Sequence, residues 1–413
     1  MGKLSIGGLW MIAYRDLGRN RRRSALTLVA VTLGMALLVV MSGLIAGAIG
    51  SSLDNSIRLQ TGHVQVRATS YDEDEVSLKW EDLLQDPQGL ATQIQALNGV
   101  QVATPVLWAN GMLTARDESV GVQVYGIDPL SEAHAPIRDA LVGGEFLAPD
   151  DRGSILIGQR LAESLGVAIG QDISLLVSTA DQQPDEAIFT IRGLYATGIS
   201  NYDETTVFLS LSKAQAFTRT GERASSIRVL LDDREQAEVV AAALRTLERS
   251  VLTWRELNKV LLQAMEQGAV FLQLMYLVVL GIVAVVIANT LLMAVFERTR
   301  EMGILAALGM KGRQILLMFL MEAATLALAG IVLGDLLGGL GVAYFATAGL
   351  PIGDAAAAAS TNIIAYGNML YARFSPSDMV SLSVMGLIIT LLASLYPAWL
   401  AARLEPIEAL RAL

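Results

Sequence analysis

Four long stretches with almost no charged residues constrain this chain more than any other feature. Residues 24–49 carry no charge, and a helix of this length exceeds the roughly 30 Å hydrocarbon core of a bilayer at about 1.5 Å per residue. Three similar stretches follow, at 268–296, 315–347 and 380–402. The pattern predicts a membrane α-helical protein with four transmembrane helices.

The N-terminal region allows more than one interpretation. Arginines precede the first stretch and Ala46-Gly47-Ala48 resembles a cleavage site, as in a secretory signal peptide. The apolar core of a signal peptide is only about 7–15 residues, so we interpret residues 24–50 as a membrane span. Before it, Leu4, Trp10 and Tyr14 recur at near-helical spacing, which is typical of an interfacial amphipathic helix; a continuous extension of the span is the alternative.

Composition supports a membrane protein with an acidic external part. The chain is 53% hydrophobic and only 17% charged. Residues 51–267 hold 17 Lys and Arg against 31 Asp and Glu, which argues against a nucleic-acid partner because phosphate binding needs clustered basic residues. The absence of cysteine excludes disulfides, thiolate nucleophiles and Cys-based zinc sites.

Orientation follows from Lys and Arg, which concentrate beside membrane spans on the cytoplasmic side. They precede the first span, separate the second from the third and follow the fourth, so both termini are expected in the cytoplasm of a bacterial cell and the large domain outside its inner membrane. The expected order is a cytoplasmic amphipathic helix 1–23, TM1 24–50, external domain 51–267, TM2 268–296, cytoplasmic coupling segment 297–314, TM3 315–347, short external loop 348–379, TM4 380–402 and cytoplasmic tail 403–413.

The external domain is predicted to be α+β and two-lobed, inserted between helices 1 and 2. At least four strands are expected before residue 126, with turns at Asn110-Gly111 and Asp117-Glu118. Helices are expected at 86–97, 159–165, 212–219 and 234–249, and further strands at 173–177 and 187–195. A first lobe would combine residues around 51–135 with 205–265, and an inserted lobe would occupy about 140–205.

No catalytic or metal site is expected. The sequence contains no G-x-x-x-x-G-K-[ST] loop, so this chain is not expected to hydrolyse ATP. His63 and His134 stand alone, without the neighbouring ligands of a metal site or the partner of a nucleophile. The acidic run 72–75 lacks the ligand spacing and turn glycine of a calcium loop, which favours a solvated loop.

Two acidic residues and two rows of glycines lie within the spans. A charge inside a span must face protein or a polar cavity, which makes Glu322 and Asp335 functional candidates; Glu322, two turns past Arg313, is the more readily structural. Small residues four apart let helix backbones approach closely. We expect one row to serve a subunit interface and the other the helix bundle, without deciding which: Gly43 and Gly47, or Gly330, Gly334 and Gly338.

The segment between spans two and three has the pattern of a docking helix. Charges at 297, 298, 300 and 301 precede Met302, Ile304, Leu305 and Leu308 at helical spacing. A generic polar loop would not need an apolar side. The pattern therefore predicts a short amphipathic helix at the cytoplasmic surface, ended by Gly309.

This segment, R-x-x-E-M-G-I-L-x-A-L-G at 298–309, resembles the signature of the MacB/FtsX-type ABC transporter permeases. The basic start at 15–24 and the closing Y-P-A-W-L-A-A-R-L-E-P-I-E-A-L-R at 396–411 agree, and the resemblance covers the whole chain. Within the family, four further stretches are most similar to the lipoprotein-releasing (Lol-type) permeases: G-H-V-Q-V, V-Y-G-I-D-P, I-L-I-G-Q-R-L-A and G-L-Y-A-T-G-I-S-N-Y-D, starting at residues 62, 124, 155 and 193.

The resemblance implies a mechanism and a set of partners. Two permeases, copies or homologues, would pair with a dimer of cytoplasmic ATPases, which would hold the ATP and Mg; no cofactor is expected in this chain. ATPase closure would be transmitted through the spans to the external domains, lifting a lipoprotein or other amphiphilic substrate from the outer leaflet, among membrane lipids, towards a periplasmic chaperone.

Carried over to this sequence, the resemblance assigns ATPase docking to Glu297, Arg298, Arg300, Glu301, Gly303, Ile304, Leu305, Leu308 and Gly309. Ala306 departs from the family pattern, which often has a basic residue there. Two alternatives remain open. One is MacB-like efflux of drugs or peptides, which differs in needing a periplasmic adaptor and usually a fused ATPase that this chain lacks; the other is FtsX-like regulation of cell-wall hydrolases.

Overall fold

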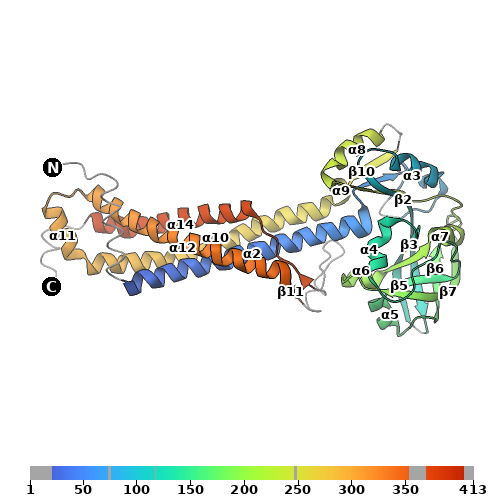
Figure 1. Ribbon diagram of the computed structural model, residues 1–413, viewed down its shortest axis with the longest axis horizontal. Coiled ribbons are helices and arrows are strands. Elements are labelled where there is room, and N and C mark those ends of the chain that lie inside the picture. Colours follow the sequence, from blue (N-terminus) through green and yellow to red (C-terminus); the bar gives the residue numbers. More distant parts are fainter. Residues whose placement is uncertain (1–20, 73–75, 117, 246–248, 353–368, 404–413) are drawn as a thin grey trace. The chain divides into compact units, whose positions relative to one another are not determined.

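The structure is a computed structural model that describes residues 21–72, 76–116, 118–245, 249–352 and 369–403. The chain forms two compact units (Figure 1). One contains the long apolar helices. The other, an α/β unit, is built from Ile49–Met265 together with Pro351–Met369. The expected N-terminal helix and C-terminal tail lie largely outside the described residues, as does half of the loop predicted at 348–379.

Four helices in the described part of the chain are long and apolar enough to cross a membrane, which confirms that prediction. They are α2 (Arg21–Ser56), α10 (Lys259–Glu297), α12 (Gly312–Ala348) and α14 (Pro376–Ala402). Each predicted span lies inside one of these helices. A short helix, α11 (Thr299–Ala307), joins α10 to α12, and the two-residue strands β11 (Leu350–Pro351) and β12 (Met369–Leu370) pair between α12 and α14.

The helical unit is organised around α2 and α12. Of the most apolar window of each helix, 44% is buried in α2 and α12, against 17% in α10 and 22% in α14. Met35 of α2, Ile287 of α10, Ile331 of α12 and Leu382 of α14 belong to one buried cluster. The outer surfaces of α10 and α14 remain apolar and exposed, as expected of helices that face lipid.

The α/β unit contains one ten-stranded sheet whose longest strand, β2 (Val100–Ala115), is shared by two halves. The other strands are β1 (Val64–Arg67), β3 (Glu118–Ile127), β4 (Leu141–Gly144), β5 (Ser154–Gly158), β6 (Asp172–Ser178), β7 (Pro184–Tyr195), β8 (Thr206–Ser210), β9 (Ser226–Leu231) and β10 (Ser250–Thr253). Short helices connect them: η2 (Trp80–Asp82), α3 (Pro87–Gln95), η3 (Glu132–His134), α4 (Ala135–Asp139), α5 (Gln159–Leu165), α6 (Ser200–Thr205), α7 (Leu211–Phe217), η4 (Arg234–Gln236), α8 (Ala237–Leu244) and α9 (Trp254–Leu257).

In one half, the start of β2 pairs with β9, which continues through β1 to β10. All four residues of β1 are buried, as in a central strand covered on both faces. Residues of α3 and α8 cover this half, and Ile94, Val229, Ala241 and Trp254 share its core. The polar end of α2 enters the same core through Leu53.

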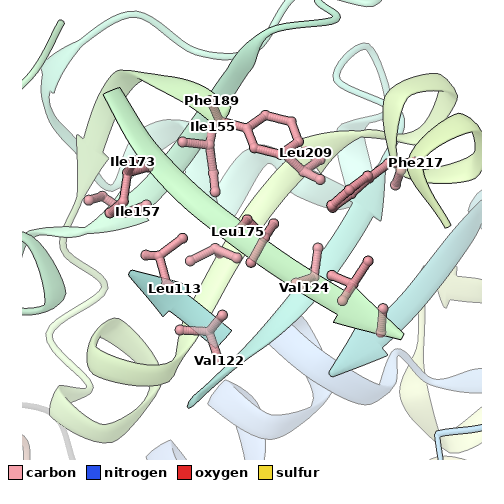
Figure 2. Packing of buried hydrophobic residues seen from close by; sticks show 14 of the residues in the cluster. Leu113, Val122, Val124, Ile155, Ile157, Ile173, Leu175, Phe189, Leu209 and Phe217 are labelled. Carbon is pink, nitrogen blue, oxygen red and sulfur yellow. The ribbon is translucent and has the colours of Figure 1, made fainter. Parts of the chain in front are cut away.

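In the other half, six strands close on themselves. β2 pairs with β3, β3 with β8, β8 with β5, β5 with β7, β7 with β6, and β6 with β2 again. Alternate residues therefore point into the ring and fill it with apolar side chains. Figure 2 shows this core, which includes Leu113, Val124, Ile155, Leu175 and Phe189.

Two sequence expectations for this unit are wrong. Asn110 and Gly111 form no turn but lie inside β2, paired with Gln123 and Val122 of β3. Gly111 is needed there because a Cβ would lie only 2.8 Å from the carbonyl oxygen of Leu176. The described part of residues 62–126 consequently holds three strands instead of the expected four.

The boundary of the inserted lobe also differs from the expected 140–205. The ring core combines residues of that range, such as Ile157 and Phe189, with Leu107 and Leu209 from outside it. The cause is topological, since β2, β3 and β8 are members of the ring. The order of the strands along the sequence does not predict which of them pair.

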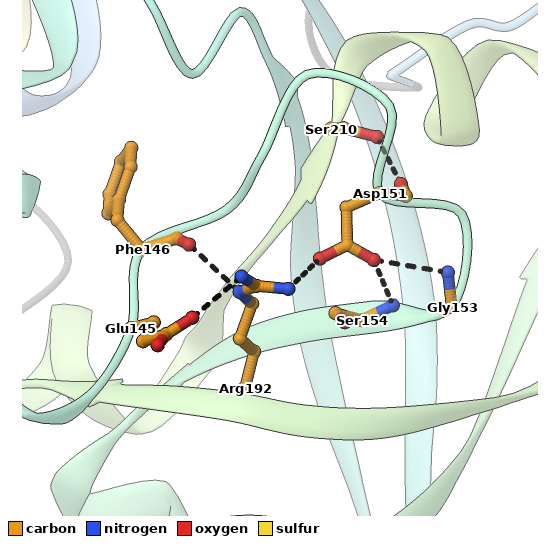
Figure 3. Close-up of polar contacts among 7 residues, drawn as sticks. All are labelled: Glu145, Phe146, Asp151, Gly153, Ser154, Arg192 and Ser210. Atoms are coloured by element: carbon orange, nitrogen blue, oxygen red, sulfur yellow. Dashed lines mark hydrogen bonds and ion pairs between the residues drawn. The ribbon is translucent and has the colours of Figure 1, made fainter.

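A polar network fixes the long connection between β4 and β5 (Figure 3). Arg192 of β7 donates to Glu145 and Asp151 at 2.7 and 2.9 Å, and to the carbonyl of Phe146 at 3.0 Å. Asp151 in turn accepts from the backbone N–H of Ser154 at 3.1 Å. The hydrogen bonds of the guanidinium thus hold this segment in place, although it forms no helix or strand.

Candidate functional site

The predicted docking segment forms a helix–turn unit between α10 and α12. α11 begins after Arg298, whose backbone carbonyl accepts from Met302 at 3.0 Å. It ends in a Schellman motif: the N–H of Met310 donates to Leu305 at 3.1 Å and that of Gly309 to Ala306 at 3.0 Å. Gly309 has a φ of +94°, a conformation that favours glycine. Both the helix and its end at Gly309 agree with the sequence.

One side of α11 is anchored in the helical unit. Met302 is 3% exposed and packs in a cluster with Phe319 of α12 and Ala398 of α14. Leu305 and Met310 pack against the same cluster, and this contact accompanies the Schellman hydrogen bonds. Gly303 is buried as well. Met302 and Gly303 are thus buried, and the half-buried Leu305 and Met310 hold the same side of the helix against the helical unit.

The opposite side of α11 is exposed and partly apolar. Ile304 and Leu308 are 45% and 64% exposed. Glu297, at the end of α10, and Arg300 are also exposed, and Glu301 is half-buried. The apolar set predicted from the sequence therefore divides: Met302 and Leu305 face inwards, whereas Ile304 and Leu308 face outwards with the charges.

Arg298 is not part of that exposed surface. Its side chain is 4% exposed, and its Nη1 lies 3.8 Å from Oε2 of Glu322, which is 3% exposed. Arg298, to which the resemblance assigns a docking role, is buried here and joins α11 to α12 through Glu322. Its docking role stays a prediction. Glu322, as predicted, faces protein.

Asp335 lies deeper in α12 and contacts α14. Its Oδ2 accepts from the hydroxyl of Ser383 at 2.8 Å. Ser383 Oγ also lies 2.8 Å from the carbonyl of Met379, so the hydroxyl is held between two acceptors. The contact joins two helices, as expected for a carboxyl group inside a span.

Both glycine rows pack against segments of this same chain. The expectation that one row serves a second subunit stays a prediction. In α12, a Cβ on Gly334 would lie 2.5 Å from the Cβ of Met35 in α2, and Gly330 and Gly338 meet Val31 and Val39 in the same way. In α2, a Cβ on Gly43 would meet Val342, and one on Gly47 would collide with the carbonyl of Tyr371. Within the described chain, the rows allow close helix packing.

The two histidines have structural partners. Nδ1 of His63 accepts from the backbone N–H of Leu231 at 2.8 Å, and Nδ1 of His134 lies 2.9 Å from Nη2 of Arg228. Burial, together with nearby arginines, lowers the pKa of both imidazoles, that of His134 well below its usual value.

The described residues contain no cluster of His, Cys, Asp or Glu able to hold a metal. Residues 73–75 of the acidic run lie outside the described residues.

Comparison with known proteins identifies two adjoining regions. Residues 24–247 match the MacB-like periplasmic core domain, and residues 274–406 match the FtsX-like permease C-terminal family. The first match alone spans more than half of the chain, and the second contains the later part of α10, α11 and α12.

Among similar proteins is the lipoprotein-releasing system transmembrane protein LolC of Neisseria meningitidis serogroup B, 26% identical over 95% of this chain and 95% of the relative. The macrolide export ATP-binding/permease protein MacB of Rhodospirillum rubrum is 27% identical over 99% of this chain and 61% of its own length. An uncharacterised ABC transporter permease of Methanocaldococcus jannaschii is 22% identical over the full length of both. The chain belongs to the MacB/FtsX-type ABC transporter permeases, with a MacB-like periplasmic core domain and an FtsX-like C-terminal region.

Proposed function

We propose that this chain is the permease subunit of an inner-membrane ABC transporter that releases lipoproteins from the outer leaflet. A separate cytoplasmic ATPase dimer would hold ATP and Mg. Its movements would be transmitted to the α/β unit, which lies outside the cytoplasm. Both termini would then be cytoplasmic, a second permease, copy or homologue, would complete the membrane part, and a periplasmic chaperone would accept the substrate.

The observation that carries the transport part of this proposal is the two-sided construction of α11. Its inner side is fixed through Met302 and Leu305, while Ile304 and Leu308 project outwards among charges. A docking helix needs both properties, because a force applied at the outer side reaches the spans only if the inner side does not yield. Arg298, paired with Glu322, adds a charged link to α12.

The lipoprotein part rests on similarity. The Neisseria LolC relative aligns with 95% of this chain and 95% of its own length. Export of macrolide-like drugs is the second candidate, favoured by the match of residues 24–247 to the MacB-like periplasmic core domain and by the Rhodospirillum relative. The two differ in substrate and not in the role given to α11.

The test examines the binding of an ATPase and the identity of the substrate separately. We would purify the tagged chain in mild detergent, identify copurifying proteins by mass spectrometry, and compare Leu308→Asp with Leu130→Asp, a control at a similarly exposed leucine of the α/β unit. Copurification of an ATPase, lost at least about tenfold in Leu308→Asp alone, is expected, because the substitution charges an interface core.

The substrate arm uses membranes that contain an acylated lipoprotein. ATP-dependent release of the lipoprotein to the aqueous phase is expected from the unmodified complex. Drug efflux without lipoprotein release would transfer the assignment to the MacB-like alternative. The absence of any copurifying ATPase would overturn the proposed function.

A further inference from the structure

The membrane helix α2 ends inside the α/β unit in a π-helical turn, η1 (Ile57–Thr61), which two buried side chains hold. Carbonyls in the last turn of a helix lack partners within the helix. The carbonyl of Leu59 accepts instead from Nη1 of Arg228 at 2.8 Å and from the hydroxyl of Tyr202 at 3.4 Å. Arg228 belongs to β9 and Tyr202 to α6, so two separate elements form hydrogen bonds with this turn.

Arg228 is an unusual residue to find at this depth. It is 2% exposed, and no carboxylate among the described residues forms an ion pair with it. Its second amino group lies 2.9 Å from Nδ1 of His134, and the lowered pKa of His134 leaves that imidazole neutral and able to accept. The printed acceptors of the guanidinium are therefore neutral, and one of them, the Leu59 carbonyl, lies at the negative end of the helix that terminates at η1.

The chain around the turn is shaped to admit Arg228. Gly62 follows η1 with a φ of +69°, and its backbone N–H closes the turn onto the carbonyl of Ile57 at 2.7 Å. A Cβ on Gly62 would lie 2.6 Å from Cγ of Arg228, so a larger residue would displace the arginine. Contacts nearer the surface are polar: Ser56 donates to Asn258 at 2.6 Å.

We propose that Arg228 is the positioning residue that fixes the end of α2 to the α/β unit, so that displacement of the helix moves the unit with it. The inference rests on the proposed function, in which movements of the spans drive this unit. The physical reason is that sliding the helix end away from Arg228 would leave a buried charge uncompensated, which makes slippage more costly than movement of the whole unit.

The test compares Arg228→Met and Arg228→Lys with Arg192→Met. Arg192 also makes several polar contacts, but only within the β4–β5 connection, so it controls for general loss of an arginine. Tyr202→Phe removes the second donor to Leu59 while keeping the ring, and serves if Arg228→Met does not fold. The full chain with its copurified ATPase is used, reconstituted in lipid nanodiscs.

Two quantities are measured by hydrogen–deuterium exchange: the protection of amides 57–62, and the change in exchange of strands β3 and β8 on addition of ATP. For Arg228→Met we expect at least tenfold faster exchange at 57–62 and loss of the ATP-dependent change, with an ATPase rate within twofold of the unmodified complex. Arg228→Lys and Tyr202→Phe should be intermediate. Arg192→Met should lower the melting temperature without affecting either quantity.

Unaltered exchange at 57–62 in the folded Arg228→Met variant would overturn the proposal, and so would an intact ATP-dependent change. Neither quantity depends on the substrate. If the unmodified complex shows the ATP-dependent change but releases no lipoprotein, the proposed function fails while the role of Arg228 stands.

Discussion

At the scale of single residues, the pair Arg298–Glu322 joins the α11 turn to α12 through two nearly inaccessible side chains 3.8 Å apart. Removing one member of a buried pair leaves the other charge without its compensation. We therefore expect Arg298→Met to lower the free energy of unfolding by about 3 kcal/mol. Thermal unfolding in detergent measures this, and the double variant Arg298→Met/Glu322→Gln should recover more than half of the loss. Strict additivity of the two single losses would contradict a direct interaction.

Asp203 supports a prediction on pH. The residue is 3% exposed, and its carboxylate accepts from the N–H and hydroxyl of Thr197 and from the N–H of Gly198. Burial nevertheless raises its pKa from 3.8 to about 6. As pH rises between these values, the unfolded chain releases this proton while the folded unit retains it, so the group's contribution to stability falls. By neutral pH the loss is about 3 kcal/mol, at about 1.36 kcal/mol per pKa unit.

Asp203→Asn isolates this effect because the amide does not titrate. The stability of the variant relative to the unmodified protein should therefore rise between about pH 4 and pH 7. Chemical denaturation at several pH values measures the difference, in which the titrations of other carboxyl groups cancel. A difference that is independent of pH would show that the raised pKa is wrong.

At the scale of elements, the contact between α2 and α12 gives a matched pair of glycine substitutions. A Cβ on Gly334 would lie 2.5 Å from that of Met35 and 2.9 Å from the carbonyl oxygen of Thr32, whereas nothing lies within 4 Å of one on Gly339. Gly334→Ala should therefore force the helices apart and cost about 1–3 kcal/mol. Gly339→Ala should be neutral or stabilising, because alanine favours helix. Melting temperatures in detergent compare the two; equal effects would contradict the close packing.

The sequence predicted those elements whose signal is local. The four apolar helices, α5 and the end of α11 at Gly309 follow from hydrophobic length, periodicity and capping. The sequence failed where pairing partners are distant: Asn110 and Gly111 read as a turn, yet β3 and β6 hold them in a strand. The same limit applies to the site, because helical spacing groups Met302 with Leu308 but does not show which side packs on α12. Arg228, whose partners are far away in the sequence, gave no signal at all.

At the scale of the whole molecule, the α/β unit depends on a strand that belongs to two cores. Residues 100–106 of β2 pair with β9, and residues 106–115 pair with β3. Residues near the two ends of the unit also contact each other, since the hydroxyl of Ser56 donates to the side chain of Asn258 at 2.6 Å. We therefore expect the excised chain 49–265 to fold by itself and to unfold in a single transition, because neither core can lose β2 while the other keeps it.

Calorimetry and far-ultraviolet circular dichroism of this fragment test the expectation. Leu113→Ala, a substitution confined to the ring core, should cost about 3 kcal/mol. If the unit is one cooperative body, this loss also appears as faster hydrogen exchange in β1 and β9 of the other half, since their most stable amides exchange through global unfolding. Two separate transitions, or unchanged exchange in β1, would mean that the halves unfold independently. In that case, force delivered at η1 would extend β2 before it moved the ring.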